Sequence, residues 1–242
     1  MIALIRRPLD DYLAALTPFA SGWRWSRLAV FAAALLLTWW VYVPIHELAH
    51  AFGCVLGGGT VTRLEVDPLY GAALLQRVFP FVHVGSDYAG QLTDFDTGGN
   101  DAVYLLTDFL PFVATILIGV PLLHAAARPG RHPLVQAALF GAAIPIAFAP
   151  FVSLTGDYYE MGSIIVSRLA AAVRPGFDPA RWRSDDLARL AERLFAADGG
   201  GGVLDAAVLA VSFVVGLALA VVTYAAGAAV ARMWGGAGVA AS

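Results

Sequence analysis

Two histidines and a glutamate early in the chain have the residue types and the spacing of a metal-dependent hydrolase. His46, Glu47 and His50 form the pattern H-E-x-x-H. Residues four apart lie on one face of an α-helix, so the two imidazoles can bind the same metal ion. Glu47 follows the first histidine directly, and from there its carboxylate can take a proton from a water on that ion. The pattern predicts a catalytic metal site, with Zn²⁺ as the expected ion.

The residues before the motif place it in or beside a membrane. Residues 28–45 form an uncharged, apolar run that ends at His46. Ionisable side chains next to such a run are costly and usually mark a functional site. The competing interpretation is structural: the two histidines and Glu47 would only satisfy one another's hydrogen bonds inside a helix bundle.

The composition of the whole chain is that of a membrane protein. Of its 242 residues, 59% are hydrophobic and only 14% are charged, whereas about a quarter of the residues of an average soluble domain are charged. Four segments are long and apolar enough to cross a bilayer, and we expect transmembrane helices at residues 28–56, 110–127, 133–155 and 206–231. The predicted fold class is therefore an all-α polytopic membrane protein.

Charge and apolar content also narrow the partners and the location. The formal net charge of −3 gives no indication of nucleic-acid binding. We expect this chain to contact the lipid bilayer and a membrane-anchored protein, as substrate or as partner. The predicted location is a cell membrane that the chain crosses several times, and a bacterial inner membrane is the expected one.

A small β-hairpin is predicted after the motif helix. Three glycines at residues 57–59 end that helix, residues 61–66 have the pattern of a short strand, and residues 78–84 that of a returning strand. The hairpin would cover residues 60–84, and residues 94–101 would form an aqueous loop. A free strand edge near a peptidase site can hold an extended substrate segment. The alternative is a hairpin that only caps the helix bundle.

The remaining segments are predicted to lie at the membrane surface or outside it. Leu9, Tyr12, Leu13 and Leu16 have the spacing of a short surface helix, and Ser184 can begin an amphipathic helix that precedes the last span. A helix end is expected at residues 174–176. The chain then divides into an N-terminal interfacial segment at 1–27, a metallopeptidase-like core at 28–172, an extramembrane loop at 173–202, and a fourth transmembrane helix with its tail at 203–242.

An acidic residue after the third span is the predicted third metal ligand. Catalytic zinc usually has three protein ligands and a water. Spans one and three run in the same direction, so their C-terminal ends, near His50 and Asp157, reach the same membrane face. Pro150 and Gly156 can break the third helix and aim the carboxylate inward. Asp157 is the first choice and Glu160 the alternative; helix capping by Asp157 and a solvated or ion-paired Glu160 are the structural interpretations.

The other polar residues in the apolar core are interpreted differently. Cys54 is expected to be a small packed residue of a helix interface rather than a ligand. Asp108 can pair with an arginine or orient a ligand, and Asn100 can bind a substrate backbone. The three remaining histidines are interpreted as loop or interfacial residues: His83, His124 and His132.

These features together resemble the site-2 protease family of intramembrane zinc metallopeptidases. The shared features are H-E-x-x-H on one transmembrane helix, a glycine-rich stop with a hairpin, one intervening span, and an aspartate in an interrupted third span. The resemblance covers about residues 28–166 and implies that His46, His50 and Asp157 bind zinc and that Glu47 is the general base. The family's third-ligand motif usually reads Leu-Asp-Gly, whereas residues 154–157 here read Leu-Thr-Gly-Asp. The chain would be a minimal, divergent member.

Three functions are compatible with these observations. The first is a zinc metalloendopeptidase that hydrolyses peptide bonds of membrane-associated proteins. The second is a catalytically inactive, peptidase-like subunit that acts as a scaffold or assembly partner in a membrane complex. The changed order of Gly156 and Asp157 and the small size of the chain favour it. A transporter or ion pathway is the third, and for it the H-E-x-x-H spacing would be a coincidence.

Overall fold

The fold was obtained as a computed structural model, which describes residues 2–21, 24–173, 178–196 and 199–237. The described chain is mostly helical and contains a small three-stranded sheet. It forms two compact units, one of residues 1–149 with 223–242, and one of residues 150–222. The helix end predicted at 174–176 and the last residues of the predicted tail, 238–242, lie outside the described residues.

Three helical segments are long and apolar enough to cross a membrane. They are Trp25–Leu56, Asp101–Ala126 and Val203–Trp234. A fourth results if Pro133–Ala147 and Ala149–Thr155, which are bent by 44° relative to each other, count as one broken span. The prediction of a mostly helical chain is confirmed, and three to four helices of the described chain are long and apolar enough for a membrane protein.

The second apolar segment begins earlier than predicted and is irregular. Its first helix, α4 (Asp101–Phe109), starts at Asp101 because the Asn100 side chain accepts a hydrogen bond from the Ala102 N–H. A 3-10 turn, η2 (Leu110–Phe112), and a π-helical turn, η3 (Thr115–Gly119), separate α4 from α5 (Val120–Ala126). Asn100 is therefore a helix cap, which is a structural role that the sequence analysis did not assign.

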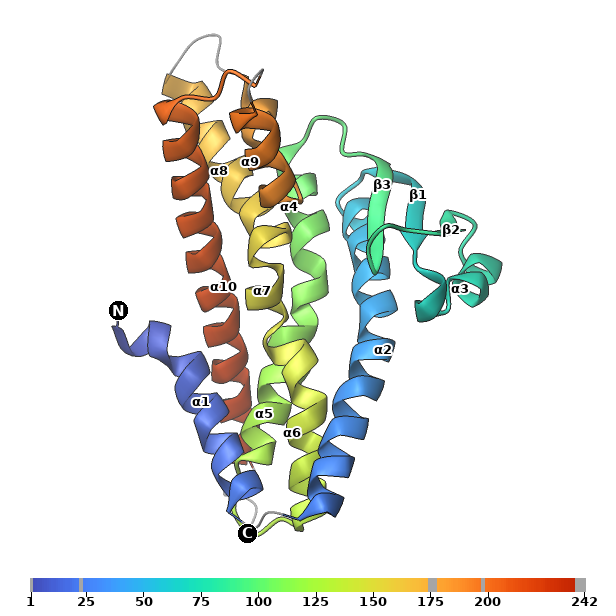
Figure 1. The fold of residues 1–242 in the computed structure, drawn as a ribbon, viewed down its shortest axis with the longest axis vertical. Coiled ribbons are helices and arrows are strands. Elements are labelled where there is room, and N and C mark those ends of the chain that lie inside the picture. Colours follow the sequence, from blue (N-terminus) through green and yellow to red (C-terminus); the bar gives the residue numbers. More distant parts are fainter. Residues whose placement is uncertain (1, 22–23, 174–177, 197–198, 238–242) are drawn as a thin grey trace. The chain divides into compact units, whose positions relative to one another are not determined.

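The first apolar segment is one long helix, α2 (Trp25–Leu56), which packs along α6 (Pro133–Ala147) (Figure 1). The two backbones approach closely at Gly141, where a Cβ atom would collide with the Phe31 carbonyl oxygen. At the end of α2, Gly58 has a φ of +94°, a left-handed conformation that glycine adopts without strain. The predicted glycine stop at residues 57–59 is thus confirmed.

The sheet has three strands in the order β2-β1-β3, and the predicted hairpin is wrong. The central strand β1 (Thr60–Val66) pairs in parallel with β2 (Val82–Val84) and antiparallel with β3 (Gly90–Asp96). Parallel neighbours need a crossover rather than a tight turn. That crossover contains η1 (Pro68–Tyr70) and α3 (Ala72–Val78), so the strand predicted at 78–84 is reduced to its last three residues.

The sheet packs on the C-terminal half of α2 (Figure 1). The Trp39 indole N–H donates to the Tyr70 hydroxyl at 3.2 Å, and that of Trp40 donates to the Leu69 carbonyl at 2.7 Å. The packed core is apolar and joins α2, the crossover and two strands: Leu48, Ala51, Leu64, Val66, Ala72 and Val82. The sheet is therefore held against the same part of α2 that carries the H-E-x-x-H motif.

The N-terminal helix α1 (Ile2–Ala20) is longer than predicted and is packed on one side. Leu9 and Leu13 are exposed, while Ala15 and Phe19 are buried, and the Phe19 ring packs in a tilted orientation on Phe140 of α6, with the ring centroids 5.7 Å apart. Asp11 on this helix accepts a hydrogen bond from His124 Nε2 at 3.0 Å and from the Tyr224 hydroxyl at 3.3 Å.

Of the two alternatives for His124, a loop residue is excluded, because it is a half-buried residue in the last turn of α5. Arg7, one turn before Asp11, has its Nε 3.5 Å from the same carboxylate oxygen. Three groups of different elements thus converge on one acid, which ties α1 to α5 and to the last helix.

The second unit contains α8 (Asp157–Val173), η5 (Pro179–Trp182), α9 (Leu187–Phe195) and the first part of α10 (Val203–Ala237). The predicted amphipathic helix is confirmed as α9, with Leu190 and Leu194 buried. Its cap is Asp186, whose side chain accepts from the Arg189 N–H at 2.9 Å, and not Ser184. The Ser184 hydroxyl instead exchanges hydrogen bonds with the Asp186 backbone.

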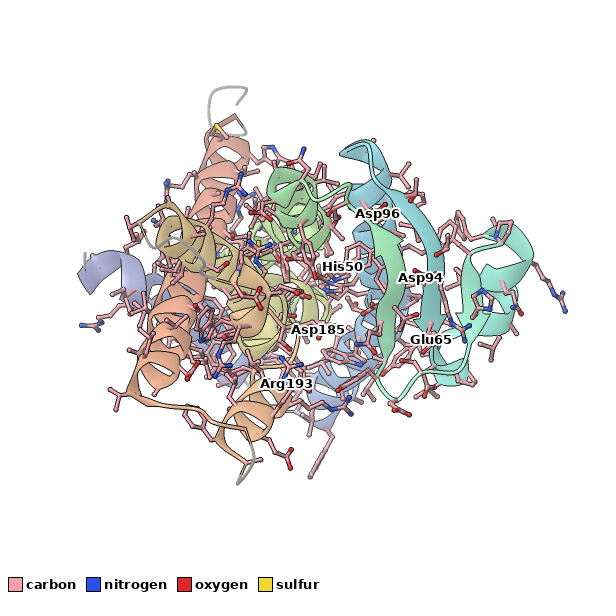
Figure 2. All side chains as sticks on the ribbon, turned by 90° about the horizontal axis from the view of Figure 1, so that it is seen from above. His50, Glu65, Asp94, Asp96, Asp185 and Arg193 are labelled. Atoms are coloured by element: carbon pink, nitrogen blue, oxygen red, sulfur yellow. The ribbon has the colours of Figure 1, made fainter. Side chains whose placement is uncertain are left out.

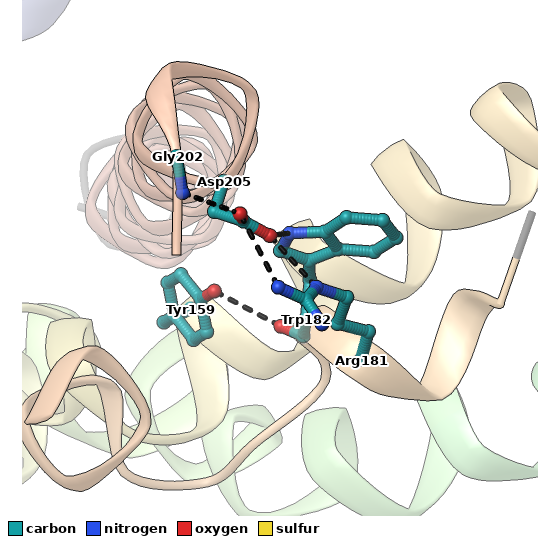
Figure 3. A network of polar contacts seen from close by, with 5 residues as sticks. All are labelled: Tyr159, Arg181, Trp182, Gly202 and Asp205. Atoms are coloured by element: carbon teal, nitrogen blue, oxygen red, sulfur yellow. Dashed lines mark hydrogen bonds and ion pairs between the residues drawn. The ribbon is translucent and has the colours of Figure 1, made fainter. Parts of the chain in front are cut away.

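A polar network fixes η5 against the start of α10 (Figure 3). Asp205 accepts from Arg181 Nε at 2.8 Å, from Trp182 Nε1 at 3.0 Å and from the Gly202 N–H at 2.9 Å. The Tyr159 hydroxyl of α8 donates to the Trp182 carbonyl at 2.9 Å. An acid in the first turn of a helix also interacts favourably with the helix dipole. This network is structural, because each of its groups holds one element of the unit to another.

The Asp11 contacts give a prediction about acid stability. Burial raises the pKa of Asp11, but the hydrogen bond and charge of His124, the charge of Arg7 and the Tyr224 hydroxyl lower it further, so its pKa lies below the ordinary 3.8. A carboxyl with a lowered pKa in the folded state stabilises the fold above its ordinary pKa, and this contribution is lost as the pH falls through the folded value.

We expect Asp11→Asn to lower the free energy of unfolding at neutral pH by about 1–2 kcal/mol, the size of a partly exposed charged hydrogen bond. It should also flatten the loss of stability below pH 3.8. Denaturant unfolding in detergent measures both effects. Asp10→Asn is the control, since Asp10 is exposed and pairs only loosely with Arg6 at 3.8 Å. Equal losses in both variants would contradict a specific role for Asp11.

Candidate metal centre

The two motif histidines lie together on α2. The ring nitrogens that they offer to a metal lie within 4.8 Å of each other. Their rings are 4.9 Å apart, centroid to centroid, and nearly perpendicular at 78°. Two nitrogens that bind one zinc ion at about 2.0–2.1 Å lie at most about 4.2 Å apart, so this limit admits a shared ion with at most a small movement of the two rings. The predicted pairing of His46 with His50 is therefore sterically possible.

The tautomer of His50 is set by its hydrogen bond to α4. Its Nδ1 lies 2.9 Å from the Thr107 carbonyl oxygen, and the residue is buried. A carbonyl oxygen only accepts, so Nδ1 must carry the hydrogen. In the neutral imidazole the lone pair is then on Nε2. Metal-binding histidines commonly have this arrangement, in which the other ring nitrogen donates to a carbonyl.

Two local features make the Thr107 carbonyl available to His50. In an α-helix this oxygen would accept from the N–H four residues later, but that residue is Pro111, which has no N–H. Gly53 allows α4 to come close to α2, because a Cβ atom there would lie 2.6 Å from the Leu106 carbonyl oxygen and 3.0 Å from Thr107 Cα. A proline in one helix and a glycine in the other thus create the acceptor and bring it within reach.

Tyr42 and Phe112 hold the ring of His46. The Tyr42 hydroxyl lies 3.2 Å from His46 Nδ1, and Phe112 packs edge-to-face on the ring at 5.2 Å. Tyr42 is buried and lies one helical turn before His46. A hydroxyl can donate or accept. When it accepts from Nδ1, the Nε2 lone pair of His46 is available to a metal, as it is in His50.

Glu47 occupies a different face of α2, towards the sheet. It lies four residues before Ala51, which is buried in the sheet core. The Glu47 side chain rests against Gly90, the first residue of β3. The general-base candidate is therefore next to the two ligand candidates along the helix and in contact with a strand that the sequence analysis did not predict.

Asp157 begins a new helix in the second unit. The predicted helix break is confirmed, because η4 (Ser153–Thr155) ends at Gly156, and α8 starts with Asp157. Among the described residues, His46, His50 and Asp157 form the group that could hold a metal ion. Glu160, the alternative third ligand, is buried on α8 and is not a member of this group.

The other polar residues considered in the sequence lie in packed or capping positions. Cys54 is fully buried, as expected for a packed residue, and its S–H donates to the Thr60 carbonyl oxygen, 3.6 Å from Sγ. His83 lies in β2, which excludes the loop and leaves the interfacial alternative, and His132 caps α6 by accepting from the Leu134 N–H at 3.3 Å. Asp108 is buried on α4, directly after the residue whose carbonyl holds His50.

The sheet beside the motif is acidic. Figure 2 shows His50 on α2 with Asp94 and Asp96 on β3 and Glu65 on β1. Asp94 and Asp96 are exposed, whereas Glu65 accepts a hydrogen bond from Arg63 at 2.7 Å. Exposed carboxylates make the local potential more negative and favour a nearby cation over an anion.

No protein-family model, no curated protein and no solved structure matches this chain. The resemblance to site-2 proteases therefore depends on the motif residues and their order, and it stays a prediction. What the structure adds is the surroundings of these residues. Tyr42, Thr107 and Gly90 were not foreseen. Only the first of them, one helical turn before His46, could have been found from spacing alone.

Tyr42→Phe should weaken metal binding without disturbing the fold, because it removes only the hydroxyl that orients His46. Loss of such a partner typically lowers metal affinity about 10–100-fold. A competition titration with a zinc chelator measures this change. Tyr12→Phe is the matched control, since the Tyr12 ring packs at 5.5 Å on Phe140 and lies away from the motif. An affinity unchanged in Tyr42→Phe would exclude the orienting role.

Pro111→Ala should also weaken metal binding, and for a less intuitive reason. The new N–H would compete with His50 for the Thr107 carbonyl, while alanine favours a continuous helix here more than proline does. We therefore expect lower metal affinity without lower stability, from the same titration together with thermal unfolding. Pro121→Ala, in the same apolar segment, should leave the affinity unchanged.

Proposed function

We propose that this protein is a membrane-embedded zinc metallopeptidase that cleaves membrane-associated proteins. The observation that carries the proposal is the pairing of His46 and His50 on α2, with the His50 Nδ1 hydrogen engaged by the Thr107 carbonyl. With Nδ1 engaged in this way, Nε2 is the ring nitrogen that His50 can offer to a metal shared with His46. The apolar helices support a membrane location, and we place the protein in a cell membrane that the chain crosses several times.

The donor set fits zinc. Two imidazoles and one carboxylate are a known ligand set of catalytic zinc, and they leave a position for water or substrate. His46 and His50 would supply Nε2 atoms, and Asp157 would supply a carboxylate oxygen. A bound zinc ion would supply Lewis acidity, which polarises the scissile carbonyl and makes water acidic enough to ionise near neutral pH.

Glu47 would carry out the proton transfers. Its carboxylate would accept a proton from the attacking water and then pass it to the leaving amine, as a general base and general acid in turn. This role needs a carboxylate that is not itself a ligand. Glu47 meets that requirement because it lies on the sheet-facing side of α2, beside the two histidines.

The edge strand of the sheet could bind a substrate segment in extended form. A membrane helix cannot be cleaved until it unwinds, because its carbonyls are hydrogen-bonded within the helix. The strand β3 is an edge of the sheet and touches Glu47 through Gly90. An unwound segment added to this edge would keep its backbone hydrogen bonds satisfied while it lies close to the general base.

An inactive, peptidase-like scaffold is the second candidate. The order of Gly156 and Asp157, reversed relative to the usual Leu-Asp-Gly, favours it. In that case His46 and His50 would bind a metal for structural purposes or bind none. The two candidates differ in whether Glu47 does chemistry, so the decisive experiment compares metal content and turnover in the same samples.

The test uses purified protein in detergent and a panel of fluorophore-labelled, single-span membrane peptides as substrate. We expect about one equivalent of zinc per chain. Glu47→Gln should retain the metal and lower the cleavage rate by about 10²–10⁴-fold. His46→Ala and Asp157→Asn should lose or weaken metal binding, while His83→Ala and Glu160→Gln should not.

Two results would reject the peptidase. Cleavage that persists in Glu47→Gln would remove the mechanism, and a folded protein that binds no zinc would leave the scaffold as the better description. Zinc binding that is independent of Asp157 but needs both histidines would reject Asp157 as the third ligand.

A further inference from the structure

We propose that Gly90 is a positioning residue for Glu47: the absence of a side chain at Gly90 allows the Glu47 carboxylate to lie against the backbone of β3, where it serves the reaction. The proposal rests on the proposed function, because it concerns the geometry of that general base. It adds a requirement that the H-E-x-x-H pattern itself does not contain.

The contact is close enough to exclude any side chain. A Cβ atom built on Gly90 would collide with Glu47 Cγ, and it would lie 2.7 Å from Cδ and 3.0 Å from Oε2. All three nearest atoms belong to the same glutamate side chain. Carbon atoms in good packing contact lie about 3.5–4.0 Å apart, so alanine cannot occupy this position with Glu47 where it is.

The backbone conformation of Gly90 gives no other reason for a glycine. The glycines with positive φ in the described chain include Gly58, Gly71 and Gly85, but not Gly90. Any residue could adopt its conformation in a strand. The requirement for glycine at this position therefore comes from its neighbour, and that neighbour is the candidate general base.

The backbone of Gly90 is held by the sheet. It pairs with Val66, which is fully buried at the centre of the sheet core, and the adjacent Ala89 carbonyl accepts from the Asp67 N–H at 3.1 Å. A glutamate side chain, by contrast, can change rotamer at a cost of a few tenths to about one and a half kcal/mol. If a methyl group is added at position 90, the carboxylate should move and the strand should stay.

Gly90 differs in this respect from the glycines at which two backbones pack closely together. At Gly53 an added Cβ would meet the Leu106 backbone, 2.6 Å from its carbonyl oxygen, so the helices themselves would have to separate. At Gly90 only a flexible side chain must give way. Substitution of Gly53 should therefore destabilise the fold, whereas substitution of Gly90 should mainly misplace a carboxylate.

Misplacement matters because a general base acts only within hydrogen-bond reach of the proton, about 2.6–3.2 Å between heavy atoms. A displacement of about 1 Å can lower a rate by about 100-fold. His50 contacts Thr107 of α4, and His46 contacts Phe112 of η2. Neither histidine is among the atoms nearest to an added Cβ at Gly90, so metal binding should be unaffected. The expected result is a protein with its metal and its fold but without its base in place.

The experiment compares Gly90→Ala, Gly202→Ala, Glu47→Ala and the double variant Gly90→Ala/Glu47→Ala in the full chain in detergent. Gly202 is the control because an added Cβ would meet nothing within 4 Å there and its φ is not positive. Zinc affinity, the cleavage of the labelled peptides and the thermal unfolding midpoint are measured for each variant.

For Gly90→Ala we expect zinc affinity close to that of the unchanged protein and a kcat lowered by at least about 100-fold, with KM nearly constant. The midpoint should fall by only about 2–4 °C. In the Glu47→Ala background the same glycine substitution should cost no stability, because the side chain it displaces is gone. Gly202→Ala should behave as the unchanged protein.

Two outcomes would overturn the proposal. One is a Gly90→Ala protein that cleaves peptides at the normal rate. The other is an equal loss of stability on Gly90→Ala with and without the Glu47 side chain, which would show that the methyl group meets something else. If the unchanged protein cleaves no peptide, the proposed function fails, but the comparison of midpoints still decides whether Gly90 makes room for Glu47.

Discussion

The candidate centre depends on one hydrogen bond, from His50 Nδ1 to the Thr107 carbonyl at 2.9 Å. Within an apolar bundle a backbone carbonyl without a donor costs free energy, and so does a polar ring nitrogen without a partner. The hydrogen bond between them satisfies both groups. Pro111 removes the donor that the carbonyl would otherwise have had, and the bond that replaces it orients a metal-ligating imidazole. The break in the helical hydrogen bonding at Pro111 therefore fixes the orientation of the His50 ring.

The geometry of α2 then divides the chemistry between two sides of the helix. Successive residues are rotated by about 100°, so Glu47 cannot share the face of His46. The histidines meet α4 and η2, and Glu47 meets the sheet through Gly90. A general base must stand beside the metal without binding it. Here the sheet provides that separate surface, since its core residues pack on Leu48 within the motif and on Ala51 directly after it.

How much of this could be predicted from sequence follows from the range of each interaction. The motif, the glycine stop and the helix break before Asp157 are encoded by neighbouring residues, and all three were predicted. The predicted hairpin was wrong because strand-pairing partners are not encoded by neighbouring residues. Strand β1 pairs antiparallel with β3, which is more distant in the sequence, and its pairing with β2 is parallel. Strand β3 reads Gly-Gln-Leu-Thr-Asp-Phe-Asp, in which glycine and two aspartates hide the strand pattern. The contact of Gly90 with Glu47 depends on that pairing and was out of reach for the same reason.

A second proline shows that the arrangement at His50 follows a more general rule. The Thr115 hydroxyl donates to the Ile146 carbonyl at 2.7 Å. Four residues after Ile146 is Pro150, which has no N–H to give. Prolines are tolerated in apolar helices where side chains of neighbouring helices satisfy the freed carbonyls. At Ile146 the donor is a threonine and the result is only a link between α6 and η3. At Thr107 the donor is the Nδ1–H of His50. The second ring nitrogen of this histidine, Nε2, then stays available as a metal ligand. Whether a proline in such a bundle has a structural or a functional role therefore depends on the side chain that donates to the freed carbonyl. A threonine hydroxyl only links two elements, whereas an imidazole can also bind a metal.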